Sequence, residues 1–508
     1  MSAGPRAAAR VALAVAACGV ATWMPVALGA SGAPGADEDA PVRPPNVVVF
    51  FADDLGHGDL GCYGSPTNRT PHLDRLAAEG VRFTDAYSAS PGCTPSRAAL
   101  LTGCQPQRVG LPSVLSPRAQ VGLSPDETTM AEVLAAKGYA TAAIGKWHLG
   151  DAPNLMPWNH GFEDVLCLPY SNDMWTYNWG TRDVGLIGRD RWGPIPLWSR
   201  RPGEAPEVVA RDPRQDSLTP RYTARALEFV RANADRPFFL YLAWSHPHTP
   251  LAASAPFLGA SGAGLYGDVL LELDDSVGRV VDLVEELGLA RDTVVVFASD
   301  NGPWTRFGDH GGSTGGLRGD KGTTFEGGVR VPLIAWGPGR VGAGRVEGRV
   351  ASLMDLLPTL ARLAGASPGD GAWPTLPIDG VDITALLQGT LDPALEERLL
   401  VHYWPDQLQA LRHGRWKLHL PHGHRTVVEA GRDGHPGVQG SGRIGLSLFD
   451  LAADPGETTD VAAEHPEVVA RLQAWAEAVR ERLGDRGRVG SEVRAPGRAI
   501  RGAADAGE

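Results

Sequence analysis

The chain has 508 residues, a formal net charge of −12 at pH 7, and 43% hydrophobic residues, a composition that is ordinary for a folded globular protein. The acidic balance provides no basic field that could release counterions from phosphates, so it argues against a nucleic-acid-binding function. Only four of the 47 basic residues are lysines, which makes each one notable: Lys137, Lys146, Lys321 and Lys417.

The first thirty residues are predicted to form an export signal. Arg6 and Arg10 give a positively charged start, a short apolar stretch covers residues 11–21, and small residues follow at 27–33. The apolar run is shorter than the roughly 20 residues of a membrane span, so no transmembrane segment is expected. An alternative is a lipoprotein signal, in which Cys18 ends a lipobox and is lipidated. The protein is therefore predicted to be secreted or periplasmic, and lipid-anchored if Cys18 is used.

A polar linker over residues 31–44 leads into alternating strand and helix patterns. This alternation predicts an α/β fold with a large, mainly parallel sheet sandwiched by helices, in a catalytic domain over residues 45–363. Apolar strand-like runs occupy residues 46–51, 139–144, 237–243, 293–298 and 331–336. Helical patterns occupy residues 71–80, 127–137, 222–234, 265–287 and about 352–363.

A smaller C-terminal subdomain of antiparallel strands and one helix is predicted over residues 378–484. A Gly-, Pro- and Ala-rich stretch at 364–377 marks the boundary before it. Residues 421–443 are rich in His and Gly and are predicted to be a surface loop, and residues 485–508 are predicted to be a disordered tail. Short strands are expected at 399–403, 416–420 and 446–450, and the helix at 466–483.

Polar residues gather where the predicted strands of the catalytic domain end. Because ligands of open α/β sheets bind outside the carboxyl ends of the strands, these groups are expected to converge on one site. Taken singly, each group is typical of an ordinary turn or helix cap. Four oxygen donors together suit a hard cation such as Ca²⁺, or Mg²⁺ as the second choice. The groups are Asp53–Asp54, Lys146 with His148, His246 with His248, and Asp300–Asn301.

A cysteine at position 93 lies at a turn that leads into a helix. The helix N-terminus favours negative charge, and Arg97, about one turn later, could direct its guanidinium to the same place. Taken alone, this pattern also fits a half-buried structural thiol. The remaining cysteines of the mature chain are interpreted as core thiols or as containing a single disulfide: Cys62, Cys104 and Cys167.

The segment from Cys93 to Gly103, Cys-Thr-Pro-Ser-Arg-Ala-Ala-Leu-Leu-Thr-Gly, resembles the signature of the type I, formylglycine-dependent sulfatases. The resemblance extends from about residue 45 to about 485 and is strongest to the branch of arylsulfatase A and galactosamine-6-sulfatase. It implies the alkaline phosphatase superfold. Other matching segments are Asp53–Gly56, Gly145–Gly150, Pro169–Asp173, Ser299–Gly302, Leu317–Gly328 and Leu448–Thr458.

This resemblance implies that a formylglycine-generating maturation enzyme oxidises Cys93 to Cα-formylglycine, whose gem-diol attacks the sulfur of a sulfate monoester. It assigns one Ca²⁺ ion to four ligands: Asp53, Asp54, Asp300 and Asn301. Arg97 and Lys146 would stabilise the diol, His148 would take a proton from it, and Lys321 and His248 would contact the sulfate and leaving oxygen. His246 is the alternative to His248, and Ser171 would touch the substrate.

The main hypothesis is therefore a sulfatase that acts on aryl or carbohydrate sulfates. One alternative is a formylglycine-dependent phosphonate monoester or phosphodiester hydrolase, because that chemistry also transfers a tetrahedral anion. Another is a non-catalytic glycan-binding homologue in which Cys93 stays unmodified. The sequence does not identify the natural substrate.

Overall fold

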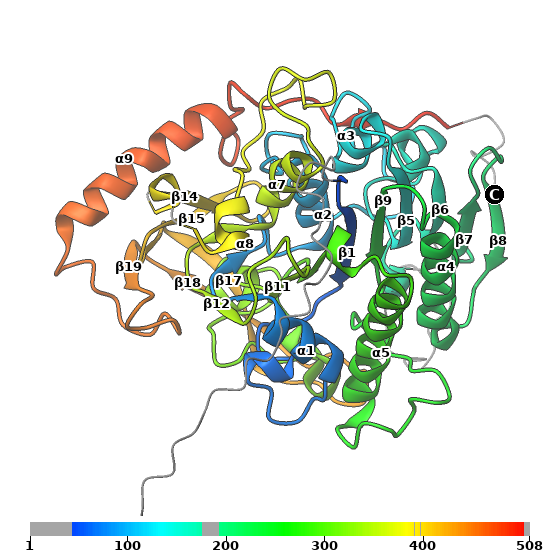
Figure 1. The fold of residues 1–508 in the computed structure, drawn as a ribbon. Coiled ribbons are helices and arrows are strands. Elements are labelled where there is room, and N and C mark those ends of the chain that lie inside the picture. Colours follow the sequence, from blue (N-terminus) through cyan, green and yellow to red (C-terminus); the bar gives the residue numbers. More distant parts are fainter. Residues whose placement is uncertain (1–42, 175–192, 391, 397, 502–508) are drawn as a thin grey trace, which may run out of the picture. The chain divides into compact units, whose positions relative to one another are not determined.

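A ten-stranded sheet forms the centre of the computed structural model, which describes residues 43–174, 193–390, 392–396 and 398–501 (Figure 1). The predicted export signal and nearly all of the predicted linker lie outside these residues. The strand order is β12-β2-β11-β10-β1-β9-β5-β6-β7-β8. The strands, in chain order, are β1 (Asn46–Ala52), β2 (Val81–Phe83), β5 (Ala140–Lys146), β6 (Asp164–Leu168), β7 (Pro196–Arg200), β8 (Glu207–Arg211), β9 (Phe238–Ala243), β10 (Thr293–Ser299), β11 (Leu333–Trp336) and β12 (Arg345–Glu347).

Five adjacent strands at the centre of this sheet, β10, β1, β9, β5 and β6, run parallel. The predicted strand at 331–336 is present as β11, but it runs antiparallel to β10. β7 and β8 also add antiparallel pairs at the other edge. The predicted α/β class with a mainly parallel sheet is confirmed, and the antiparallel strands lie toward its two edges.

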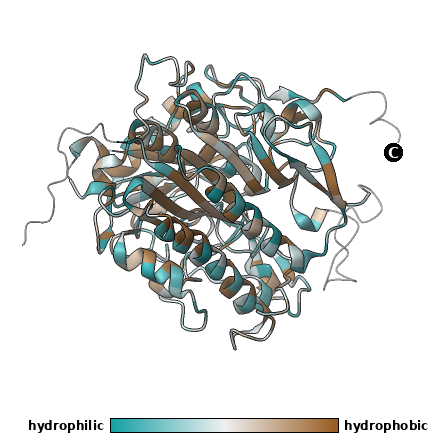
Figure 2. Cartoon of the chain, turned by 45° about the vertical axis from the view of Figure 1, so that its right-hand side comes forward, coloured by the Kyte–Doolittle hydropathy of each residue, from teal (hydrophilic) through white to brown (hydrophobic). Residues whose placement is uncertain are grey.

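Helices cover both faces of the sheet because the central strands are apolar on both sides. Val47, Val49 and Phe51 of β1 face one hydrophobic core, and Val48 and Phe50 face the other. Hydrophobic colour fills the strands between the helices in Figure 2. The first core contains α2 (Cys93–Thr102), α3 (Met130–Ala136) and α7 (Leu356–Leu363), and the second contains α1 (Pro71–Glu79), α4 (Leu218–Ala232) and α5 (Gly264–Glu286).

The C-terminal part contains a four-stranded antiparallel sheet and a closing helix with a hydrophobic core of their own, as predicted. The prediction of a surface loop at 421–443 is wrong, because β17 (His422–Glu429) and β18 (Val438–Ile444) form a hairpin there. Nearly all residues of the two strands are half or fully exposed, so they give little hydrophobic strand pattern. The sheet and helix are β14 (Leu399–Tyr403), β15 (Leu408–His413), β16 (Trp416–His419), β19 (Ser447–Asp450) and α9 (Pro466–Leu483).

The chain after α9 is ordered through Arg501, so the prediction of a disordered tail from residue 485 is wrong for residues 485–501. β20 (Gly497–Arg498) pairs with β4 (Val121–Gly122). Arg494 makes two hydrogen bonds of 2.7 Å to the carboxylate of Glu127. Arginine-rich composition suggests disorder, but Arg494 and Arg501 have specific acidic partners, Glu127 and Asp151.

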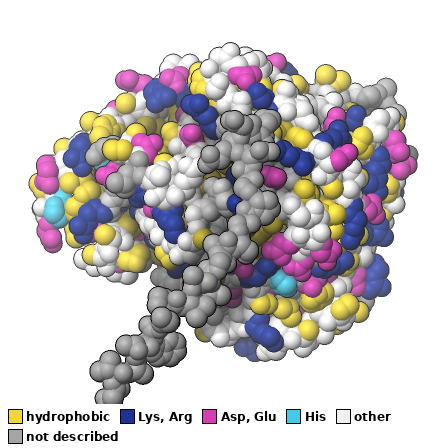
Figure 3. Space-filling model, in the orientation of Figure 1, with side chains coloured by type: hydrophobic (Ala, Val, Ile, Leu, Met, Phe, Trp, Pro, Cys, Tyr) yellow, Lys and Arg dark blue, Asp and Glu magenta, His cyan; other side chains and the backbone are white. Residues whose placement is uncertain are grey.

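Short elements complete the description: β3 (Ala86–Tyr87), β13 (Ala351–Ser352), α6 (Glu326–Val329) and α8 (Thr384–Gln388). None of the helices in the described residues is both long and apolar enough to cross a membrane. Cys62, Cys104 and Cys167 are free thiols; Cys104 and Cys167 are buried, as a core-thiol interpretation requires, and Cys62 is half-buried. Basic and acidic side chains both occur over the face in Figure 3.

Candidate active site

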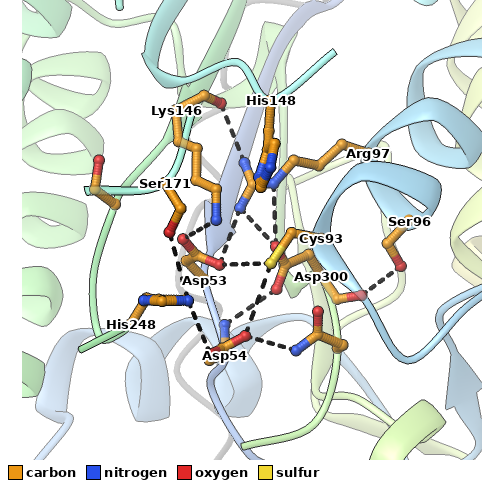
Figure 4. Close-up of polar contacts among 12 residues, drawn as sticks. Asp53, Asp54, Cys93, Ser96, Arg97, Lys146, His148, Ser171, His248 and Asp300 are labelled. Atoms are coloured by element: carbon orange, nitrogen blue, oxygen red, sulfur yellow. Dashed lines mark hydrogen bonds and ion pairs between the residues drawn. The ribbon is translucent and has the colours of Figure 1, made fainter. Parts of the chain in front are cut away.

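The site lies at the carboxyl ends of the central parallel strands, as the sequence predicts. Ala52 of β1 pairs with Ser299 of β10, so the residues that follow, Asp53 and Asp300, emerge side by side. The backbone N–H of Asp54 donates to Asp300 Oδ1 over 3.0 Å, which joins the two strand ends directly. Lys146 is the last residue of β5. Figure 4 shows these side chains pointing toward one another.

Cys93 is the first residue of α2 and its side chain points into this group (Figure 4). Its Sγ lies 3.4 Å from Asp53 Oδ1 and 4.0 Å from Asp54 Oδ1. Burial raises the pKa of the thiol well above its usual value, so it is not poised as a thiolate. Gly92 precedes it because a Cβ there would lie 2.6 Å from a ring carbon of Trp404.

Arg97 lies one turn after Cys93 and is fully buried. Its Nη2 and Nε donate to Asp300 Oδ2 over 2.7 and 3.1 Å, and its Nη1 donates to the carbonyl of Lys146 over 3.1 Å. This planar, multiply bonded guanidinium therefore fixes the start of α2 against the ends of β10 and β5.

Two of the four lysines enter the same site. Lys146 Nζ lies 2.5 Å from Asp53 Oδ2, and Lys321 Nζ lies 2.7 Å from Asp54 Oδ2. Burial alone would raise the pKa of Asp53, but Lys146, His248, Arg97 and Lys321 together hold it well below its usual value. Burial opposes the charge of Lys146, yet Asp53 raises the pKa of that lysine, so its ammonium stays charged.

His148 is held as a neutral imidazole. Its Nε2 lies 3.0 Å from the carbonyl of Leu115, which requires a proton on Nε2, and its buried Nδ1 has no hydrogen-bond partner. Burial and then the charge of Lys146 lower the pKa of His148 well below its usual value. The ring of Tyr170 packs edge-on against it. Its geometry is that of a base with a free Nδ1 lone pair.

His248 reaches the site through its ring, whereas no hydrogen bond joins the ring of His246 to a site residue in the described part of the chain. His248 Nε2 lies 3.5 Å from Asp54 Oδ2 and 3.4 Å from Ser171 Oγ, and its Nδ1 lies 2.5 Å from the carbonyl of Thr249. His246 Nδ1 instead lies 3.4 Å from Thr219 Oγ1, and burial lowers its pKa to about 4. The backbone carbonyl of His246 accepts the N–H of Asp53.

The donor set fits a hard divalent cation. Asp53, Asp54, Asp300 and Asn301 are all buried and offer only oxygen. Asn301 Nδ2 donates to Asp54 Oδ1 over 2.7 Å, and Asn301 Oδ1 is buried without a partner. Burial and neighbouring Asp53 raise the pKa of Asp300 to about 6, so an added positive charge would stabilise its ionised form. A second possible set of metal ligands is Asp53, Asp54, Cys93 and His248, each of which has one potential ligand atom within 4.8 Å of those of the others.

Comparison with known proteins identifies the family of this chain. The model of the sulfatase family matches residues 45–366, and the model of the C-terminal region of aryl-sulfatase matches residues 395–493. The chain belongs to the sulfatase family. It is 43% identical over 460 residues to arylsulfatase A from Bos taurus, covering 86% of this chain and 87% of that protein.

Other relatives are sulfatases as well. N-acetylgalactosamine-6-sulfatase from Canis lupus familiaris is 39% identical over 484 residues, covering 89% of this chain and 87% of that protein. The crystal structure of the PsFucS1 sulfatase from Pseudoalteromonas sp. superimposes with a TM-score of 0.76 at 30% identity, covering 86% of this chain and 91% of the other. The protein is thus a sulfuric ester hydrolase, an enzyme that hydrolyses sulfate monoesters. Its family implies a formylglycine and a bound metal.

Two residues that contact the candidate site, Trp304 and Thr94, are not among those predicted from the sequence. The ring of Trp304 lies 4.4 Å from Lys321 Nζ and 5.5 Å from the ring of His248, so it forms an aromatic wall beside both. Thr94 Oγ1 donates to the carbonyl of His148 and accepts the N–H of Leu115. The only signal for Trp304 was its position directly after the Asp-Asn-Gly-Pro turn, which gives no indication of side-chain direction.

Proposed function

We propose that Cys93, after oxidation to Cα-formylglycine by a maturation enzyme, is the nucleophilic centre of this sulfatase. The hydrated aldehyde supplies a hydroxyl that can attack sulfur and a second hydroxyl that permits release of sulfate. The observation that carries this proposal is the position of Cys93, buried at the start of α2 with Sγ 3.4 Å from Asp53 and with Lys146, Lys321 and Arg97 among the surrounding cations.

We also propose that Asp53, Asp54, Asp300 and Asn301 hold one Ca²⁺ ion. The bound cation would polarise a sulfate oxygen and lower the pKa of a nearby hydroxyl. Support comes from the four buried oxygen donors and from the unpartnered Oδ1 of Asn301. Calcium is preferred to zinc because the set has no imidazole, and Mg²⁺ is the second choice.

The remaining residues divide into anion-binding groups and proton carriers. Lys146 and Arg97 would place positive charge beside position 93, and Lys321 would do so on the side of Asp54. His148 has a free Nδ1 and would accept a proton from the group at position 93. His248, whose Nε2 faces Asp54 and Ser171, would donate a proton to the leaving oxygen.

His246 is not assigned a chemical role, because its side chain faces Thr219. Ser171 Oγ would contact the substrate. The substrate class is proposed to be a sulfated small molecule or glycan, as the names of the relatives suggest. Export through residues 1–30 remains a proposal too, and N-terminal sequencing of the mature protein would test it against lipidation at Cys18.

Turnover of 4-nitrophenyl sulfate tests the proposed nucleophile. Cys93→Ala should abolish turnover while circular dichroism and thermal unfolding stay close to those of the parent. Cys62→Ala is the control, since that free, half-buried thiol lies outside the site and its loss should leave turnover unchanged. Retained activity in Cys93→Ala would refute the assignment. A strong preference for a phosphonate monoester over the aryl sulfate would favour the phosphonate hydrolase alternative.

A further inference from the structure

A pocket of about 250 Å³ lies between the Gly-rich loop that follows β10 and the β17–β18 hairpin. The hairpin belongs to the C-terminal part of the chain. The pocket is lined by Phe325 and, chiefly, by polar and charged residues: Thr305, Arg318, Asp320, His424 and Arg425.

The two arginines of this pocket have backbone partners in place of acidic ones. Arg425 Nη2 donates to the carbonyl of Lys321 over 2.6 Å, and Arg318 Nη1 donates to the carbonyl of Glu457 over 2.8 Å. Neither guanidinium has a carboxylate within 4 Å among the described residues, although both are half-buried. By contrast, the more deeply buried Arg97, Arg108 and Arg225 are each in an ion pair.

Charge around the pocket is therefore positive. Asp320 is its one acidic residue, and the carboxylate of Asp320 accepts the hydroxyl of Thr305 over 2.7 Å. His424 adds a buried Nδ1 without a partner. Partly desolvated guanidinium groups are stabilised by an anion that can accept two hydrogen bonds, and a carboxylate or sulfate has this geometry. The guanidinium groups of Arg318 and Arg425 supply donors that such an anion could accept.

The pocket adjoins the reaction centre through Lys321. Arg425 is bonded to the backbone of Lys321, while the ammonium of Lys321 reaches Asp54. Thr305 of the pocket directly follows Trp304, whose ring contacts the Lys321 ammonium and faces His248. A substrate that places its sulfate beside Lys321 and His248 could therefore extend its leaving group past Trp304 toward Arg425.

We propose that this pocket binds a second anionic group, a carboxylate or a further sulfate, carried by the leaving group of the substrate. The preferred substrate is then an acidic sulfated glycan rather than a neutral sulfate ester. This inference rests on the proposed function for the position of the sulfate, and it adds the substrate class. Arg425 and Arg318 are the specificity-determining residues, and Phe325, under the guanidinium of Arg318 at 4.1 Å, positions that arginine.

Binding to the Cys93→Ala protein tests the proposal without requiring a matured active site. Isothermal titration would use three disaccharides in which N-acetylgalactosamine 6-sulfate is joined to a neutral hexose, to a uronic acid or to a sulfated hexose. The dianionic ligands should bind roughly tenfold more tightly than the neutral one, and Arg425→Gln should remove that difference. The better of the two dianionic ligands identifies the second anion as carboxylate or sulfate.

Arg415→Gln is the matched control, since it removes one positive charge from an arginine of the same subdomain that pairs with Asp450 outside the pocket. It should leave all three dissociation constants unchanged. In the enzyme that retains Cys93, Arg415→Gln should leave turnover of 4-nitrophenyl sulfate within about twofold, because Arg415 lies outside both the pocket and the reaction centre. Equal affinity for the three disaccharides, or equal loss for all three in Arg425→Gln, would overturn the inference. Turnover of the aryl sulfate by the parent would then still support the proposed function.

Discussion

Replacing Lys417 with methionine should destabilise the protein far more than the same replacement of Lys137. Lys417 Nζ lies 2.8 Å from Glu326 Oε1 and 3.1 Å from Glu457 Oε1, and all three side chains are fully buried. Lys137 Nζ lies 3.0 Å from Asp370, but both side chains are more than a quarter exposed. The two pairs have nearly the same length and differ in solvent exposure.

The expected loss of unfolding free energy depends on the environment of the carboxylates that lose their lysine partner. Without Lys417, two buried carboxylates face each other with less positive charge between them, and breaking a buried ion pair in this way costs about 3–5 kcal/mol. Losing the Lys137 pair should cost far less, because water solvates Asp370 after the change. Burial already raises the pKa values of Glu326 and Glu457, and removing Lys417 raises them further.

Urea unfolding followed by tryptophan fluorescence measures both free energies. Carboxyl groups whose pKa is raised in the folded state favour folding at low pH and lose that contribution as pH rises. The deficit of Lys417→Met should therefore be larger in mildly alkaline than in mildly acidic buffer. A deficit below about 1 kcal/mol, similar to that of Lys137→Met, would refute the reasoning about burial.

Three further outcomes are expected. Burial lowers the pKa of His160 from 6.5 to about 4, so its neutral ring contributes stability above pH 6.5 that is lost as pH falls toward 4. His160→Phe should therefore flatten the curve of unfolding free energy against pH between pH 6.5 and 4. An unchanged slope would contradict this role of His160. Residues 115–122 form the loop whose Leu115 carbonyl binds His148, and β20 pairs with the end of this loop. Removing residues 494–508 should increase amide hydrogen exchange in residues 115–122 and should lower kcat more than it raises KM. Unchanged exchange would show that β20 does not hold the loop in place. Chelation with EGTA should abolish aryl sulfate turnover and lower the unfolding temperature, with recovery of both on adding Ca²⁺; full activity after exhaustive chelation would contradict the four-oxygen metal site.

Much of the site could be predicted because it depends on strand ends. The continuous apolar runs of β1, β5 and β10 identify buried parallel strands, and the polar residues after them share one edge of the sheet. Lys146 and Lys321 stand out in a chain with four lysines, and both bind the carboxylates of that edge. The sequence gives no indication of the role of Lys417, because its partners Glu326 and Glu457 are distant in sequence and belong to no predicted strand end.

The failures have physical causes as well. β17 and β18 have polar, half-exposed residues and many glycines, so their hairpin pairing leaves little hydrophobic pattern in the sequence. The segment 485–501 is ordered by ion pairs and by pairing with β4, which depend on tertiary contacts and not on local propensity. The choice between His246 and His248 likewise depended on side-chain direction, which spacing alone cannot give.

The central claim is that Cys93 becomes the nucleophilic centre of a sulfatase, and the mass of the peptide that contains it tests this most directly. Conversion removes one sulfur and two hydrogen atoms and adds one oxygen. The account predicts that turnover of 4-nitrophenyl sulfate rises in proportion to the converted fraction across preparations made with and without a formylglycine-generating enzyme. Full turnover by a preparation whose position 93 is entirely thiol would contradict it.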